Sequence, residues 1–271
     1  MHARSALFDV YGDHLRTRGS QAPVATVVRL LAPVGIAAPA VRTAISRMVM
    51  QGWLEPVQLA SGRGYRATEL ATDRLDRAAD RIYRLDQPRW DGTWQLVFVA
   101  PPPERAARNR LRADLGFVGY AELADHVWVS PFTRPELGSV LERAGATGRT
   151  AVATDFDPPP TEAWDLAALR DAYARWPRVA EELVGGAAGP GASDDPDRAA
   201  FAARFHLVHE WRKFLFADPG LPAELLPPDW PGHAAAERFA EDAGLLKPGA
   251  DRFVARCLDG RPGEGSGTLS P

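Results

Sequence analysis

The segment PAVRTAISRMVMQGWLEP, residues 39–56, has the periodicity of an amphipathic helix with an unusual polar face. At about 3.6 residues per turn its apolar residues form one stripe, made of Val41, Ala44, Ile45, Met48 and Val49. The opposite face carries two arginines and two small hydroxyl residues, without a carboxylate to pair with them: Arg42, Thr43, Ser46 and Arg47. Such a face predicts close contact with an anionic surface.

The residues on either side predict a small helical module with a β-hairpin. Amphipathic patterns favour helices over Ser5–Arg18, Pro23–Ala32, Pro39–Gln51 and 69–85. Two extended runs, 53–59 and 64–68, are joined by ASGRG, residues 60–64, whose glycines favour a turn. Three helices, a tight turn and a two-stranded wing predict a winged helix-turn-helix, in which Pro39–Gln51 is the recognition helix.

This arrangement gives a DNA-contacting role to side chains on the recognition helix and on the wing. Arg42 and Arg47 are long enough to reach guanine edges or phosphates in a major groove about 12 Å wide. Thr43 and Ser46 allow close approach and can bond to base edges or to the DNA backbone. The wing would contact the flanking backbone or the minor groove through Arg63, Tyr65 and Arg66. The alternative is the same scaffold used for protein contacts, with a solvated arginine face.

Charge is distributed unevenly along the chain. The protein has 271 residues and a formal net charge of −3, and this length suits two or three modest domains. Met1–Thr68 contains eight arginines and three acidic residues, a balance of +5 that leaves −8 for the remainder. A basic module on an acidic body suits a polyanionic partner that is met by one end of the protein only.

Targeting signals and cysteine pairs are both missing from the sequence. No apolar run approaches the roughly 20 residues that a membrane helix needs, and Met1–Gly19 has no apolar signal core. We therefore expect a cytoplasmic protein that makes no membrane contact. The single Cys257 cannot form an internal disulfide and has no second cysteine for a zinc site.

The middle of the chain alternates strands and helices. Extended runs occur at 94–100, 118–123, 126–130 and 150–156, and helical runs occur at 103–116 and 134–145. Their order, βαββαβ, predicts a ferredoxin-like domain.

Motifs in three separate regions give the sequence a family resemblance. The N-terminal region contains YGD, RLLAPVGI and VRTAISRMVMQGWL, the central region WDGTWQLVFV and LGFVGYAELADHVWVSP, and the C-terminal region LVHEWRKFLFADPGLPAELLPPDWPG. In this order they resemble the PaaX family, the repressors of phenylacetic acid catabolism, over most of the chain. The wing departs from the family pattern, because GRGYRATE, residues 62–69, replaces an arginine-rich strand of the RRSYYRLT type. This departure leaves the operator preference open.

The resemblance implies an α+β protein of several domains. We expect a winged helix-turn-helix over 1–88, a ferredoxin-like domain similar to the small Cas2 nucleases over 89–157, and a helical effector and dimerisation domain over 158–271. Composition further predicts a flexible loop at 185–196 and a disordered tail at 259–271. The family's function implies a repressor on double-stranded operator DNA. We expect a homodimer, because two recognition helices must face half-sites about one or more helical turns apart. An aryl-acyl-CoA such as phenylacetyl-CoA would release it, and no cofactor is expected.

Two groups of residues are candidate contacts for such an effector. Arg105, Arg108 and Arg112 share a helical face at spacings of three and four, as a cluster for coenzyme A phosphates requires. A solvated polar face gives the same pattern, and contact with DNA phosphates is a further alternative for these arginines. A second group offers an imidazole, an indole and a guanidinium together, in His209, Trp211 and Arg212, and core packing is the alternative role for these residues.

A metal site is not predicted. His206 and His209 are three residues apart, whereas a helical zinc protease motif places its histidines four apart around a glutamate.

Two other classes of function remain as alternatives. A metal-dependent nuclease of the Cas2 type needs an acidic ligand at the end of the first central strand, where Val99 and Ala100 stand instead. Without that carboxylate, and without a Ser-His-Asp set or a phosphate-binding loop in a suitable context, we expect no enzyme. A protein-interaction adaptor that keeps the scaffold but not DNA binding is the other alternative, and it predicts no salt-dependent affinity for DNA.

Overall fold

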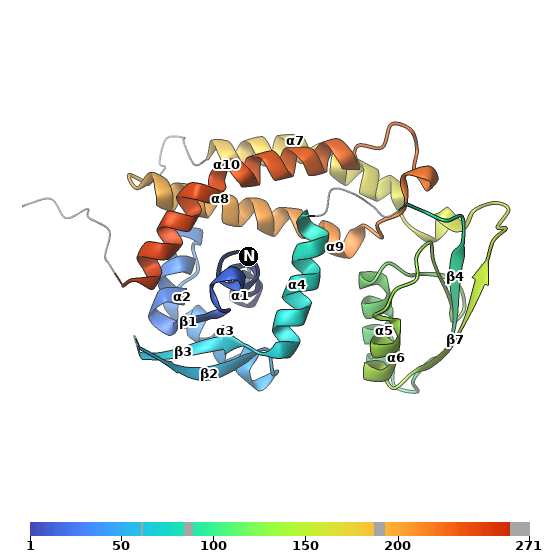
Figure 1. Ribbon diagram of the computed structural model, residues 1–271, viewed down its shortest axis with the longest axis horizontal. Coiled ribbons are helices and arrows are strands. Elements are labelled where there is room, and N and C mark those ends of the chain that lie inside the picture. The colour runs from blue at the N-terminus through green and yellow to red at the C-terminus, as the bar shows by residue number, and fades with distance from the viewer. Residues whose placement is uncertain (61, 84–88, 187–192, 261–271) are drawn as a thin grey trace, which may run out of the picture. The chain divides into compact units, whose positions relative to one another are not determined.

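The computed structural model describes residues 1–60, 62–83, 89–186 and 193–260, and these residues fall into two compact units (Figure 1). The first unit groups the described residues of Met1–Tyr83, Pro177–Trp211 and Glu237–Pro271. The second unit groups those of Arg84–Trp176 and Arg212–Ala236. The C-terminal part of the chain therefore contributes helices to both units.

The domain ranges expected from the sequence are divisions along the chain, and they stay a prediction. Each expected range is one continuous segment, whereas each compact unit combines separate segments, and the range 158–271 is divided between the two units. Residues 187–192 of the loop expected at 185–196, and residues 261–271 of the tail expected at 259–271, lie outside the described residues.

The first unit begins with a helical segment and a small sheet. Its elements are α1 (Ala3–Asp9), the π-helical η1 (Val10–Leu15), η2 (Arg16–Arg18), β1 (Gln21–Pro23), α2 (Val24–Leu31), η3 (Ala32–Val34), α3 (Ala38–Met50), β2 (Leu54–Leu59), β3 (Gly62–Ala67) and α4 (Glu69–Tyr83). The helix expected over Ser5–Arg18 thus changes from α to π and then to 3-10 geometry. It ends at Gly19, whose φ of 79° is the left-handed conformation of a helix C-cap.

The small sheet contains one strand more than the expected hairpin. β3 pairs antiparallel with β2 and also with β1, giving the order β1-β3-β2. β1 has only three residues, which are too few for an alternating apolar pattern to predict this strand from the sequence. The central strand needs glycine at position 64, because a Cβ there would lie 2.6 Å from the Leu59 side chain and 2.7 Å from the Ala22 carbonyl oxygen. Gly64 therefore lets β1 and β2 approach β3 closely from both sides.

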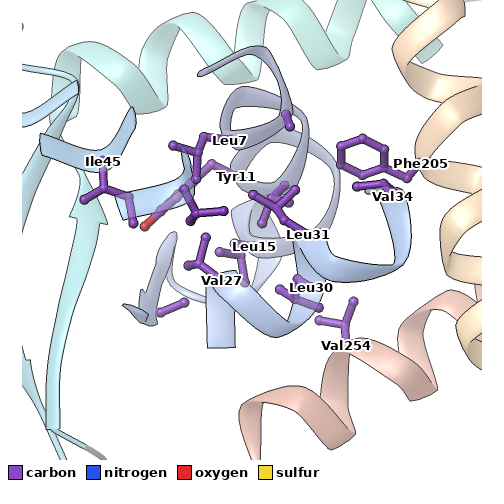
Figure 2. Packing of buried hydrophobic residues seen from close by; sticks show 14 of the residues in the cluster. Leu7, Tyr11, Leu15, Val27, Leu30, Leu31, Val34, Ile45, Phe205 and Val254 are labelled. Atoms are coloured by element: carbon purple, nitrogen blue, oxygen red, sulfur yellow. The ribbon is translucent and has the colours of Figure 1, made fainter. Parts of the chain in front are cut away.

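Helices from the C-terminal part of the chain complete the core of this unit. α8 (Pro196–Trp211) contributes Phe201 and Phe205, and α10 (Gly232–Leu258) contributes Phe253 and Val254. These side chains belong to one buried cluster with the apolar residues of α1, α2 and α3. Figure 2 shows Phe205 and Val254 pointing toward the N-terminal helices, with Phe205 near Val34 of η3. The N-terminal helices and the C-terminal helices thus share a single hydrophobic core.

A buried tyrosine joins the first helical segment to the sheet. The Tyr11 side chain is 1% exposed, and its hydroxyl donates a hydrogen bond of 3.0 Å to the Tyr65 carbonyl oxygen in β3. Burial raises the pKa of Tyr11, so the hydroxyl stays protonated and remains a donor.

We expect Tyr11→Phe to lower the free energy of unfolding by about 1 kcal/mol, because the Tyr65 carbonyl loses its donor. Urea denaturation of the full chain measures this change. Tyr65→Phe is the matched control, since the acceptor is a backbone atom and that variant keeps it. An equal loss of stability in both variants would show that ring packing matters and the hydrogen bond does not.

The second unit is built on an antiparallel sheet with helices on one face. Its first elements are β4 (Trp94–Ala100), α5 (Arg105–Phe117), β5 (Ala121–Ala124), β6 (Val127–Ser130), α6 (Leu137–Ala144) and β7 (Thr147–Ala153). The order βαββαβ agrees with the expectation from the sequence, and the strand order β5-β6-β4-β7 is that of a ferredoxin-like sheet. Val97 and Val99 of β4 pack with Leu111, Leu115 and Val140 of the two helices.

The second unit also contains helical elements that follow the sheet in the sequence. They are η4 (Pro160–Ala163), the first part of α7 (Leu166–Gly185), α9 (Phe214–Ala217) and η5 (Ala223–Leu225). The Trp164 ring stacks on the Trp94 ring at 6.3 Å between centroids. Tyr173 of α7 stacks on Phe214 at 4.2 Å and donates a hydrogen bond to Asp218. Within the described residues, none of the helices has the length and apolar character needed to cross a membrane.

Candidate nucleic-acid interface

Helix α3 separates its buried and exposed faces as the sequence predicts. Val41, Ala44, Ile45 and Met48 are buried in the core of the first unit. Arg42, Thr43, Ser46 and Arg47 are all exposed. Pro39 lies in the first turn, where a missing N–H costs no helical hydrogen bond. The helix thus presents a polar face that is held rigidly by its apolar side.

The two hydroxyls on this face bond back to the helix. Thr43 Oγ1 donates to the Pro39 carbonyl at 3.0 Å, and Ser46 Oγ donates to the Arg42 carbonyl at 3.1 Å. Each hydroxyl proton is therefore engaged, while each oxygen keeps acceptor capacity for an outside donor such as a base amino group. The hydroxyls lie close to the helix surface, so the guanidinium groups of Arg42 and Arg47 are the groups on this face that extend far enough to contact a base edge deep in a groove. Neither arginine forms an ion pair with another residue in the described ranges.

The three residues expected on the wing differ in their surroundings. Arg63 is exposed on β3 opposite Gln58, and the described part of the chain gives it no ion-pair partner. Arg66 donates two hydrogen bonds, of 2.9 and 2.6 Å, to Oε1 of Glu55 on β2. Tyr65 is half-buried and packs against the core. Of the three residues expected on the wing, Arg63 is therefore the one whose charge is most available to a phosphate, and the contact roles of all three stay predictions.

One exposed side chain on α3 was missed by the sequence reasoning. Met50 is 80% exposed and continues the polar face, because it lies three and four residues beyond Arg47 and Ser46. The same helical spacing that groups the arginines would have found it.

Two further arginines of the first unit lie over aromatic rings. Arg4 is 5.7 Å from the centroid of Phe8, and Arg74 is 5.6 Å from that of Trp53. The Phe8 and Trp53 rings meet edge to face at 5.3 Å. Phe8 lies in α1, Trp53 immediately precedes β2, and Arg74 lies in α4, so these contacts join the three elements.

We expect Arg63→Ala to weaken binding to all DNA sequences to a similar degree and to reduce the slope of log Kd against log salt by about 1. The reason is that a phosphate contact releases a counterion and reads no base. Fluorescence anisotropy at several salt concentrations measures the slope. Arg66→Ala is the control, because Glu55 already neutralises that guanidinium, and a larger change in the control would reverse this assignment.

The arginines proposed for an effector on α5 already have partners, with one exception. Arg108 donates to the Pro102 carbonyl at 3.2 Å and also to the Pro103 carbonyl. Arg112 forms an ion pair of 2.9 Å with Glu122 on β5. Only Arg105 of the three is without such a contact among the described residues. The structure thus gives a local role to two members of this candidate cluster.

The residues proposed near the end of α8 also have structural contacts. His209 Nδ1 lies 2.6 Å from Oδ2 of Asp9 in α1. Trp211 is 6% exposed, stacks on Phe239 at 4.7 Å and donates its ring N–H to the Ile82 carbonyl. Arg212 belongs to the second unit. The structure therefore supports the packing role of Trp211, and an effector role for the three residues stays a prediction.

The described residues contain no group of three or more histidine, cysteine or acidic side chains that could hold a metal ion. Cys257 is buried, and this burial raises the pKa of its thiol. His14 is also buried, and because burial disfavours the charged imidazolium it lowers the pKa of this side chain.

Three family models match successive parts of the chain. The model described as PaaX-like protein covers residues 2–71, the PaaX protein central Cas2-like domain covers 87–161, and the PaaX-like protein C-terminal domain covers 164–256. The transcriptional repressor PaaX of Escherichia coli (strain K12) is 27% identical over 275 aligned residues, which span 96% of this chain and 85% of that protein. Uncharacterized protein Rv0674 from Mycobacterium tuberculosis has a similar solved structure, with a TM-score of 0.53 and 27% identity, over 93% of this chain and 98% of that one.

Proposed function

The chain belongs to the PaaX family, and we propose that it is a transcriptional repressor that binds operator DNA through α3. The resemblance found in the sequence motifs is confirmed by these three models. The similar protein from Escherichia coli is named as a transcriptional repressor. This is a family of regulators, and enzyme activity is no part of the proposal.

The observation that carries this proposal is the exposed polar face of α3. It offers two arginines that no carboxylate of the described residues neutralises, on a helix whose other side is fixed in a hydrophobic core. A rigid helix with bidentate donors is suited to reading guanine in a major groove. α2, α3 and the hairpin of β2 and β3 would then form a winged helix-turn-helix, with Arg63 near the tip of the wing.

The proposed ligand that releases the repressor is an aryl-acyl-CoA such as phenylacetyl-CoA, and the support for it is the family resemblance. The regulated genes would encode degradation of an aromatic acid of the phenylacetate type. Release requires that the thioester bind the DNA-incompetent form more tightly, by about 1.4 kcal/mol for each tenfold loss of operator affinity. Arg105 is the candidate residue on α5 that is free to take part among the described residues.

A homodimer is part of the proposal. Two recognition helices on half-sites one or more helical turns apart bind an operator far more tightly than one helix does.

Binding to the DNA upstream of the protein's own gene tests the function. The purified full chain is mixed with this duplex at physiological salt, with phenylacetyl-CoA, with free phenylacetate, or with neither. Tight binding that only the thioester abolishes is the expected result. Absence of salt-dependent binding would favour the adaptor, which keeps the scaffold and contacts other proteins. Cleavage of the duplex in Mg²⁺ would instead favour the nuclease, although β4 ends in Val99 and Ala100 without an acidic ligand.

A further inference from the structure

A buried ion pair joins the first helical segment to a helix from the C-terminal part of the chain. Arg204 of α8 donates from Nε and Nη2 to the two carboxylate oxygens of Asp13 in η1, at 2.9 and 2.7 Å. The two residues are 191 positions apart in the sequence. Their side chains are 6% and 7% exposed. This is the two-pronged arginine–carboxylate geometry, which fixes orientation as well as distance.

The same guanidinium also reaches a third element. Arg204 Nη1 donates to the carbonyl of Ala243 in α10, in the turn before Pro248. One side chain therefore connects η1, α8 and α10 inside the first unit. A second contact also joins α8 to the first helical segment, because His209 Nδ1 of α8 lies 2.6 Å from Oδ2 of Asp9 at the end of α1.

A buried ion pair is a poor way to gain stability alone. The desolvation of two charges offsets much of their attraction, and apolar residues of similar size often stabilise a core equally well. The pair adds geometric specificity. A guanidinium and a carboxylate form their two parallel hydrogen bonds in one relative orientation, whereas contacts between apolar side chains are non-directional. Its presence beside the large apolar cluster of this unit points to a requirement for a defined register.

The acidic partner lies in a segment that sets the position of α3. η1 is π-helical, a local geometry that is frequent at functional sites. α1, which continues directly into η1, packs against α3, and η1 packs against α4 (Figure 1). A shift of η1 along α8 would therefore move the surface on which α3 rests.

We propose that the Asp13–Arg204 ion pair is a positioning device for DNA binding, through which α8 holds α1 and η1, and thereby α3, in the register that reads the operator. The proposal rests on the proposed function. It makes Arg204 a positioning residue that touches no DNA, and it makes the C-terminal helices part of the DNA-binding apparatus. A signal that reaches α8 from the rest of the chain then acts on operator affinity directly.

The test separates stability from positioning by comparing Arg204→Met with the double variant Asp13→Leu/Arg204→Met in the full chain. Removing Arg204 takes the two-pronged partner from a buried carboxylate, so the single variant should lose about 10 °C in Tm. Replacing both removes that penalty, and the double variant should regain most of the loss. The control is Arg178→Gln/Glu182→Gln, which removes an exposed ion pair from α7 in the same unit.

The decisive readout is the ratio of the affinity for the duplex from upstream of the protein's own gene to that for random DNA. We expect this ratio to fall about tenfold in the double variant despite its recovered Tm, and to stay unchanged in the control. A double variant with the wild-type ratio would overturn the proposal and leave the pair a stability contact.

A second variant decides the matter if the double variant does not fold. Arg204→Lys keeps the charge but not the two parallel bonds, and it is expected to lower the ratio by several fold. A wild-type ratio in this variant would overturn the positioning role. Wild-type protein that does not prefer its own upstream duplex over random DNA would overturn the proposed function itself, before any variant is compared.

Discussion

Replacing Phe205 by alanine is expected to lower the free energy of unfolding by about 3–5 kcal/mol. Phe205 is 1% exposed and lies in α8, yet it belongs to the buried cluster formed by α1, α2 and α3. The loss combines the transfer free energy of the ring with the cost of the cavity left behind. Because the core is shared, the N-terminal helices should lose stability together with α8.

Thermal or urea denaturation measures the size of this loss, and hydrogen exchange shows where it falls. Amides of α1, α2 and α3 should exchange faster in Phe205→Ala, although the substitution is far away in sequence. Leu245→Ala is the matched control, since that side chain on α10 is 74% exposed and its removal creates no cavity. Faster exchange confined to α8 would mean that the N-terminal helices form an independent domain.

Regular elements of this chain could be predicted because their signals are local. The stripe of α3 follows a helical period within 13 residues, and β4 is a run of seven residues rich in apolar side chains. The order of the central elements then gave the ferredoxin-like sheet. β1 and the π-helical turn at η1 have no comparable local signal, because they depend on pairing with β3 and on packing against other helices.

The candidate site shows the same division. The exposure of Arg42 and Arg47 could be predicted from the period of their own helix. The pairing of Arg112 with Glu122 was not predicted, because it requires the relative position of α5 and β5. Asp13 and Arg204 are 191 positions apart, and neither composition nor residue spacing predicts their ion pair. A single sequence therefore shows which side chains are available and leaves open which of them already have partners.

Replacing Arg47 by alanine is expected to weaken operator binding by about 1–3 kcal/mol and to relax the base preference at one position of each half-site. Arg47 is exposed on α3, and Glu55, the nearest carboxylate along the chain, is already bonded to Arg66. A guanidinium that no carboxylate of the described residues neutralises can bond to two acceptors of guanine at once. Competition among operator duplexes with single base changes measures both the loss and its dependence on position.

Arg47→Lys separates base reading from simple charge attraction. Lysine keeps the positive charge but lacks the planar pair of donors, so its salt dependence should match the wild type while its base preference falls toward that of Arg47→Ala. This outcome would establish that the geometry of the guanidinium reads the sequence. If Arg47→Ala instead loses affinity equally on operator and random duplexes and Arg47→Lys restores it fully, then Arg47 contacts a phosphate. Base reading would in that case have to come from other groups on the same face, of which Arg42 has the same reach and Met50 extends the face by one turn.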